Sequence, residues 1–157
     1  MKSTLKTVCH WMLVFVWAGI IFKMSSMPNL SPPADTFNYF DFLLKKSAHF
    51  VEYSVLAILL IAAIRNGGAS FRKAVMISIA IAVLYAASDE IHQKFVVGRS
   101  GRPMDVFIDS AGVLAGMVIF NARLKFEKLR KIRKEIINLA DLFPFADMAK
   151  REERSKI

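Results

Sequence analysis

Residues 47–64 read SAHFVEYSVLAILLIAAI, an apolar run of 18 residues whose polar side chains all lie before residue 55. Three further apolar runs occupy residues 7–22, 74–88 and 106–121. Each run is slightly shorter than the roughly 20 residues of a typical membrane-spanning helix, so we expect flanking polar residues to extend the helices. The runs are apolar nearly all round, as helices in lipid are. The sequence therefore predicts an all-α fold, an integral membrane bundle of four transmembrane helices.

The distribution of charge supports the same class of protein. Of the 157 residues 55% are hydrophobic, yet 22 are Lys or Arg, and the two kinds are segregated along the chain. A net charge of +9 is compatible with nucleic-acid binding. However, half of the basic residues follow residue 121, directly after an apolar run, and a segment that faces anionic lipid explains this more simply. We therefore expect membrane lipids, and no nucleic acid, as partners.

The C-terminal third has its own pattern. Phe126, Leu129, Ile132, Ile136 and Leu139 recur at spacings of three and four residues, with Lys and Arg between them. This pattern predicts a basic amphipathic helix over residues 121–142, of a kind that lies on the inner leaflet. The predicted domains are a four-helix membrane domain over residues 1–121 and a basic cytoplasmic tail over residues 122–157.

The positions of Lys and Arg predict the orientation. With both termini in the cytoplasm, sixteen basic residues lie inside and six lie outside. The segment Lys23-Met24-Ser25-Ser26-Met27 is a poor signal-peptidase site, so the first apolar run is interpreted as an uncleaved span. The sole cysteine, Cys9, excludes an intramolecular disulfide. We predict a multi-pass membrane protein with N-in, C-in topology.

This topology brings polar residues from three predicted spans to the same, extracytoplasmic side. They are Lys45, Lys46, His49, Glu52 and Tyr53 in the second, Tyr85, Ser88, Asp89, Glu90, His92 and Gln93 in the third, and Asp105 and Asp109 in the fourth, with Arg99 and Arg102 in the loop between the last two. Asp105, Asp109, Gly112 and Gly116 share one helical face, and the two glycines form a small-xxx-small pattern that lets helices approach closely. We therefore expect the carboxylates to point into a pocket within the bundle.

Ionisable residues within membrane spans are costly, which makes them functional candidates. The alternative is a structural ion-pair network. Five carboxylates face three plausible cations and two histidines at the predicted outer side, a near balance that is compatible with mutual pairing. We favour a functional site over a purely structural network.

The polar motifs resemble those of the VanZ-like family over about residues 7–121. The resemblance rests on Asp-Glu-Ile-His-Gln at 89–93, on Gly98-Arg99, Asp105 and Gly112, and on Lys46, His49, Glu52 and Tyr53, which match an earlier Lys-x-x-His-x-x-x-Tyr element. The chain has Val97 where the family often has Pro, and Asp109 where it often has Asn, which adds a negative charge. The family takes its name from a membrane protein linked to low-level resistance to teicoplanin, a lipid-bearing glycopeptide. The resemblance implies a bacterial membrane protein that acts near cell-envelope lipid intermediates or the antibiotic.

Three functions remain open from the residues. In the first, a pocket binds an anionic lipid-linked cell-wall precursor or a lipoglycopeptide, because the planar fork of donors on Arg suits phosphate and carboxylate. The ligand-binding candidates are Lys46, His49, Glu52, Tyr53, Gln93, Arg99, Asp105 and Asp109. In the second, the site is a hydrolase or transferase for a lipid-linked substrate, with Asp89 or Glu90 as general base and His92 or His49 as its partner. In the third, the protein is structural or regulatory: the polar pairs hold the bundle together, and the basic tail recruits a partner.

A metal centre is a weaker alternative. His49, Glu52, Asp89, His92 and Asp109 offer nitrogen and oxygen ligands, but the His-Glu-x-x-His pattern of zinc enzymes is missing from the sequence. We therefore predict no metal, and the sequence indicates no particular cofactor. Transport is the least favoured function, since no polar path continues to the inner side.

Overall fold

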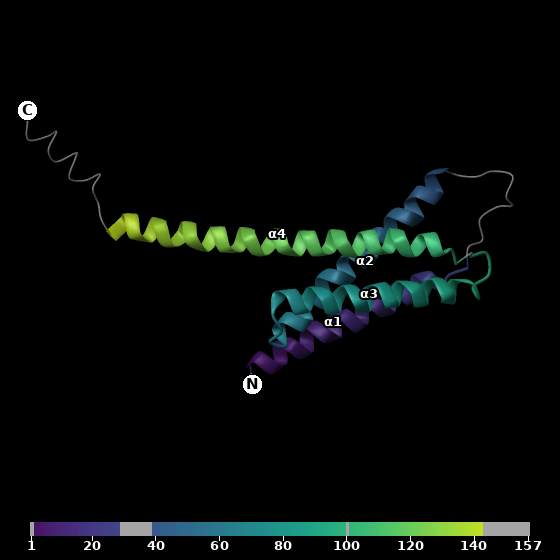
Figure 1. Cartoon of the computed structure of the whole chain (residues 1–157), viewed down its shortest axis with the longest axis horizontal. Coiled ribbons are helices and arrows are strands. Elements are labelled where there is room, and N and C mark those ends of the chain that lie inside the picture. Colours follow the sequence, from purple (N-terminus) through teal and green to yellow (C-terminus); the bar gives the residue numbers. More distant parts are fainter. Residues whose placement is uncertain (1, 29–38, 100, 143–157) are drawn as a thin grey trace, which may run out of the picture. The chain divides into compact units, whose positions relative to one another are not determined.

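The computed structural model describes residues 2–28, 39–99 and 101–142, and these residues form two compact units that divide between Phe120 and Asn121. The described residues contain four helices and no strand: α1 (Lys2–Ser25), α2 (Tyr39–Asn66), α3 (Phe71–Gln93) and α4 (Pro103–Leu142) (Figure 1). Each contains a segment that is long and apolar enough to cross a membrane. The predicted all-α fold with four membrane-spanning helices is confirmed, and flanking polar residues extend the helices as expected.

Local sequence explains where two of the helices begin. The turn after α2 passes through Gly68 at a φ of 95°, a left-handed conformation that glycine adopts without strain. The Ser70 hydroxyl then accepts a hydrogen bond from the backbone N–H of Lys73, which caps the start of α3. Helix α4 begins at Pro103, where a missing N–H costs nothing and the fixed φ suits a first helical residue.

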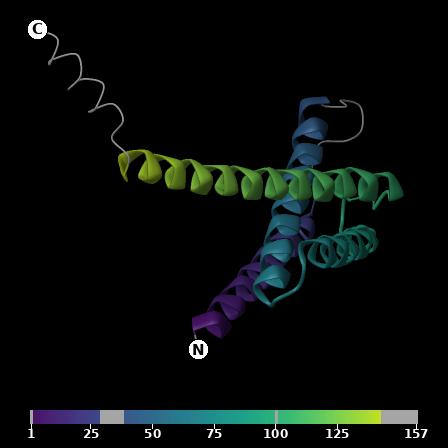
Figure 2. The same cartoon turned by 60° about the vertical axis from the view of Figure 1, so that its left-hand side comes forward.

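Helix α2 is the central helix of the first unit. Helices α1 and α3 both pack against it, and the first part of α4 contacts it as well (Figures 1 and 2). The buried side chains include Tyr53, Leu56 and Leu60 of α2 and Ile21 of α1. Large apolar side chains elsewhere on the helices are strongly exposed, among them Leu84 at 71%. Such surfaces suit a lipid environment.

Two glycines set the spacing between α2 and α4. A Cβ atom added at Gly112 would overlap the backbone carbonyl of Phe50, and one added at Gly116 would overlap that of Ser54. The Ser54 hydroxyl lies 2.7 Å from the Phe50 carbonyl oxygen and 2.8 Å from that of Gly112, so it shares its proton between the two helices. The predicted close approach at the small-xxx-small pattern is therefore present.

The basic C-terminal segment is helical as far as Leu142, as the sequence predicts, but it is not a separate helix. Helix α4 runs through 40 residues without interruption. The reason is local: no Gly or Pro occurs between Met117 and Leu142, so nothing ends the helix after the apolar run. The predicted apolar stripe is exposed at Phe126, Leu129 and Ile136. Residues 143–157 of the predicted tail lie outside the described part.

Candidate functional site

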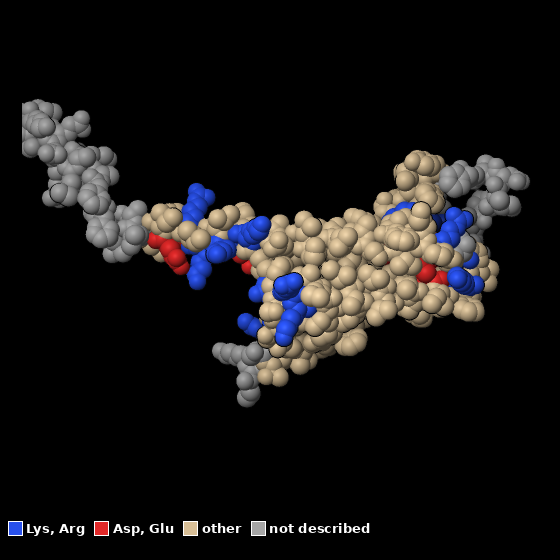
Figure 3. Space-filling model, in the orientation of Figure 1, with Lys and Arg blue, Asp and Glu red and all other residues tan. Residues whose placement is uncertain are grey.

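Charged and polar side chains gather at the end of the first unit where α1 and α3 end and where α4 begins. In Figure 3 acidic and basic atoms crowd this end, beside a surface without charged atoms. We call the following residues the polar cluster: Ser25 of α1; Lys46, His49, Glu52 and Tyr53 of α2; Asp89, Glu90 and Gln93 of α3; and Asp105 and Asp109 of α4. The three polar stretches of the sequence are thus brought together, with a fourth contribution from α1.

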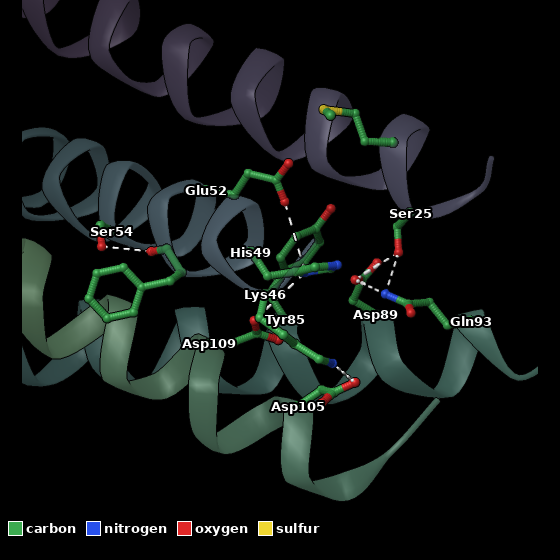
Figure 4. A network of polar contacts seen from close by, with 12 residues as sticks. Ser25, Lys46, His49, Glu52, Ser54, Tyr85, Asp89, Gln93, Asp105 and Asp109 are labelled. Carbon is green, nitrogen blue, oxygen red and sulfur yellow. Dashed lines mark hydrogen bonds and ion pairs between the residues drawn. The ribbon is translucent and has the colours of Figure 1, made fainter. Parts of the chain in front are cut away.

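Helices α2 and α4 meet through two polar contacts. The Lys46 ammonium forms an ion pair with the carboxylate of Asp105. One turn deeper, Nδ1 of His49 lies 3.7 Å from Oδ1 of Asp109 and 3.9 Å from Oε2 of Glu52 (Figure 4). Both distances are too long for hydrogen bonds. His49 therefore sits between two carboxylates without being bonded to either.

Helices α1 and α3 are joined by a hydrogen-bonded triad. The Ser25 hydroxyl donates to Oδ2 of Asp89 at 2.8 Å, and the Gln93 amide donates to the same oxygen at 3.0 Å. The Gln93 amide also donates to the Ser25 hydroxyl at 2.8 Å. Sequence reasoning missed Ser25, although its place just after the first apolar run was a usable signal.

The neighbouring His92 is engaged outside this triad. Its Nε2 lies 2.9 Å from the Ser26 hydroxyl, and its ring lies 4.6 Å from that of Phe22, measured between centroids. The structure thus separates His92, a predicted acid–base partner, from the contacts around His49.

Two aromatic side chains fix α1 against its neighbours. The Trp17 indole N–H donates to the backbone carbonyl of Glu52 at 2.9 Å. The Tyr85 hydroxyl donates to the backbone carbonyl of Ala18 at 2.7 Å. Trp17 was not predicted as part of the site, because an aromatic residue within an apolar run gives no polar signal. Its indole nevertheless contacts the backbone of a predicted ligand-binding residue.

Two further predicted site residues, Arg99 and Glu90, form hydrogen bonds with backbone groups around the loop between α3 and α4. Arg99 donates from Nε to the carbonyl of Met27 at 3.0 Å and from Nη2 to that of Met24 at 2.7 Å, beside the end of α1. Oε2 of Glu90 accepts the backbone N–H of Arg102 at 2.8 Å, just before α4 begins. Arg99 was predicted to bind a ligand and Glu90 to act as a general base. In the structure both side chains hold backbone groups in place.

Other polar atoms of the cluster have no hydrogen-bond partner among the described residues. Both carboxylate oxygens of Asp109, Oδ1 of Asp89, the Tyr53 hydroxyl and Nδ1 of His49 are buried without a hydrogen bond. Asp109 and Tyr53 are 0% exposed, and Asp89 is 3% exposed. Burying a polar group without a partner is unfavourable, and such groups are rare in proteins. These atoms are the strongest candidates for contact with a ligand.

The residues of the disfavoured metal alternative do not form a metal centre in the described part of the chain. No group of three His, Cys, Asp or Glu side chains there is arranged to hold an ion. What remains chemically is a histidine between carboxylates, which can move a proton, and a set of buried acceptors, which can receive hydrogen bonds.

Comparison with known proteins agrees with the resemblance found in the sequence. The family model described as VanZ/LLP1 matches residues 8–126, which include the whole polar cluster. No curated protein and no solved structure matches the chain significantly. Because the match covers most of the chain, including the apolar part of all four helices, the chain belongs to the VanZ/LLP1 family.

Proposed function

We propose that this VanZ-like membrane protein binds the head group of an anionic, amphiphilic cell-envelope molecule, either a lipid-linked intermediate or a lipoglycopeptide such as teicoplanin. Binding takes place at the outer face of the bacterial cytoplasmic membrane and contributes to teicoplanin resistance. The observation that carries the proposal is the Arg99 guanidinium, which two hydrogen bonds hold beside the end of α1, next to the polar cluster. Polar groups at the end of a membrane bundle are retained despite their cost where they contact a ligand.

Arg99 is the residue proposed to bind the anionic group. Its two hydrogen bonds to the carbonyls of Met24 and Met27 hold the guanidinium still and occupy two of its five N–H donors. The others can point at a phosphate or carboxylate in the bidentate manner that arginine favours. Phe95 and Val97, on the same loop, are 82% and 74% exposed. These apolar side chains suit contact with the acyl chain of an amphiphile at the membrane boundary.

The proposed orientation has a direct test. In a Cys9→Ser background, a cysteine replacing Val97 is expected to react with a membrane-impermeant maleimide added to intact cells. A cysteine replacing Lys128 is expected to react only after the membrane is permeabilised. Both positions are exposed on the protein, so a difference in labelling reports the side of the membrane and not burial of the cysteine. The opposite pattern would place the polar cluster in the cytoplasm and exclude an antibiotic that acts from outside.

Trp17 supplies a reporter for binding. The chain has two tryptophans, so Trp11→Phe leaves Trp17, bonded to the Glu52 carbonyl, as the only one. In lipid vesicles we expect teicoplanin to change the Trp17 emission saturably. Vancomycin, which has no acyl chain, is expected to have little effect. Arg99→Gln is expected to weaken teicoplanin binding by about tenfold, which corresponds to roughly 1.4 kcal/mol.

The matched control is Arg72→Gln, because Arg72 is an exposed arginine near the start of α3, remote in sequence from the polar cluster. It should bind like the parent. Susceptibility of cells that express the parent or Arg99→Gln at equal membrane levels then tests resistance. If teicoplanin leaves the emission unchanged and the parent gives no protection, the lipoglycopeptide is not the ligand. Unaltered binding by Arg99→Gln would remove that residue from the site.

An enzymatic function is the second candidate, and the position of His49 between Glu52 and Asp109 favours it. A histidine beside carboxylates is suited to general acid–base catalysis on a lipid-linked substrate. In that case His49→Gln should abolish turnover of the bound lipid, followed by mass spectrometry, while the affinity measured with Trp17 persists. Absence of any product from the parent protein would leave binding alone as the function.

A further inference from the structure

The unpartnered atoms share a chemical character that goes beyond the binding of an anion. We define the acceptor subsite as His49, Glu52, Tyr53, Asp89 and Asp109, which come from α2, α3 and α4. Figure 4 shows the side chains of His49, Glu52 and Asp109 directed toward one another. The carboxylate oxygens can only accept hydrogen bonds when ionised, and a neutral histidine accepts at one nitrogen. A ligand of this subsite must therefore supply hydrogen-bond donors.

The subsite also has more carboxyl groups than basic side chains. Three of its members, Glu52, Asp89 and Asp109, are carboxylic acids. The hydrogen bonds that reach Asp89 come from the neutral groups of Ser25 and Gln93. Within the described residues, the only ion pairs of Glu52 and Asp109 are the long ones to His49.

The neighbouring cations are committed elsewhere. The Lys46 ammonium pairs with Asp105, and the Arg99 guanidinium bonds to the carbonyls beside the end of α1. Among the described residues, His49 is therefore the only basic side chain in ion-pair contact with any of these three carboxyl groups. Charges attract strongly where water is scarce, so a cation that enters the subsite gains more than it would at an exposed surface.

The shape of the required cation follows from these partners. A metal ion would need ligands converging on one point, and no group of three suitable side chains in the described residues does so. A hydroxyl group supplies a donor but leaves the charge unbalanced. A primary ammonium supplies three donors and one positive charge, and its N–H···O contacts of about 2.7–2.9 Å reach acceptors that lie too far apart for the roughly 2.0–2.2 Å bonds of a metal ion.

We propose that the acceptor subsite binds the primary ammonium group of an amine-bearing amphiphile. This inference rests on the proposed function, to which it adds a second contact: Arg99 binds the anionic part of the ligand, and the acceptor subsite binds its amine. An aminoacylated or amino-sugar lipid head group and the amine of a lipoglycopeptide share this chemistry. The recognised molecule thus carries both charges in its head group: the negative charge lies at Arg99 and the positive charge at Asp109.

The test uses simple amphiphiles and the emission of Trp17 in the Trp11→Phe protein, in vesicles of a neutral lipid. Dodecylammonium is expected to bind saturably, and at least about tenfold more tightly than dodecyltrimethylammonium, which has the charge but no N–H donor, or dodecanol. Asp109→Asn should weaken dodecylammonium binding by about tenfold or more and leave dodecyl phosphate binding unchanged. Arg99→Gln should do the reverse. Glu127→Gln, which removes the same charge from an exposed position, is the matched control.

The two proposals fail in different ways. If dodecyl phosphate binds in an Arg99-dependent manner but dodecylammonium does not, the ammonium inference is wrong and the proposed function stands. If dodecylammonium binds and depends on Asp109 while dodecyl phosphate and teicoplanin do not bind, the subsite is real and the anionic ligand is wrong. Equal affinities for dodecylammonium and its trimethyl analogue, or an unchanged Asp109→Asn variant, overturn the inference. A saturable change of Trp17 emission on addition of aminopropanol, an amine without a long alkyl chain, supports the ammonium site and shows that the amine is sufficient for binding.

Discussion

Gly112→Ala is expected to remove most of the folded protein. The added Cβ would overlap the carbonyl oxygen of Phe50, and its next neighbours are the backbone carbonyl carbon and Cα of the same residue. Backbone cannot rotate away as a side chain can, so α2 and α4 must separate. Separation also breaks the hydrogen bond from Ser54 to the Gly112 carbonyl. Overpacking of a well-packed site costs about 1–3 kcal/mol, and we expect the upper end or more here because the clash is with backbone.

The measurement is the fraction of monodisperse protein that survives heating in detergent, followed by size-exclusion chromatography. Gly19→Ala is the matched control, because Gly19 also lies within a membrane helix and a Cβ there meets nothing within 4 Å. That control should be neutral or slightly stabilising, since alanine is the better helix former by about 1 kcal/mol. If the two variants melt alike, the contact between α2 and α4 does not hold the bundle together.

Asp109→Asn is expected to make the protein more stable while it impairs binding. Both oxygens of Asp109 are buried without hydrogen bonds, and among the described residues its one ion-pair partner, His49, is 3.7 Å away. Asparagine has nearly the same shape, carries no charge and brings two N–H donors to a region rich in acceptors. Relief of an unsatisfied buried group is worth about 1–3 kcal/mol, so the thermal midpoint in detergent should rise by several degrees.

Asp105→Asn is the comparison that makes this result specific. It makes the same change one turn earlier on α4, but Asp105 is paired with Lys46, so its loss should leave stability unchanged or lower. A fall in stability for Asp109→Asn as well would mean that Asp109 and His49 form a structural ion pair, because removing one partner of a buried pair is destabilising. That outcome would favour the purely structural role for the polar cluster over a binding site.

Much of this arrangement can be predicted from local sequence. An apolar run is recognised from its own residues alone. The four spans, and their extension by polar flanking residues, could therefore be predicted without knowing which helices are neighbours. The alternation of spans also explains why His49, Asp89 and Asp109 share one end of the bundle. The boundary between the fourth span and the basic helix was not predictable in this way, because a change of composition after Asn121 does not by itself end a helix.

The roles of individual polar residues were less predictable. Glu90 and Arg99 belong to recognisable motifs, yet the structure shows them bonded to backbone of the loop and of α1. Ser25 and Trp17 belong to no polar motif, yet they bond to Asp89 and to the backbone of Glu52. Each of these bonds joins residues more than ten positions apart in the chain, so no pattern of spacing within one helix reveals it.

By itself, the sequence determined that the chain has four membrane-spanning helices with polar residues at their ends, because hydrophobicity and charge are properties of each segment taken alone. Only the tertiary structure decided which of those polar residues hold helices and loops in place, and which atoms, above all both oxygens of Asp109 and Nδ1 of His49, remain buried without a hydrogen bond. The physical reason is that a hydrogen bond between helices forms only if the distance between donor and acceptor is correct to within a few tenths of an ångström. Between α2 and α4, the close backbone packing at Gly112 and Gly116 sets these distances.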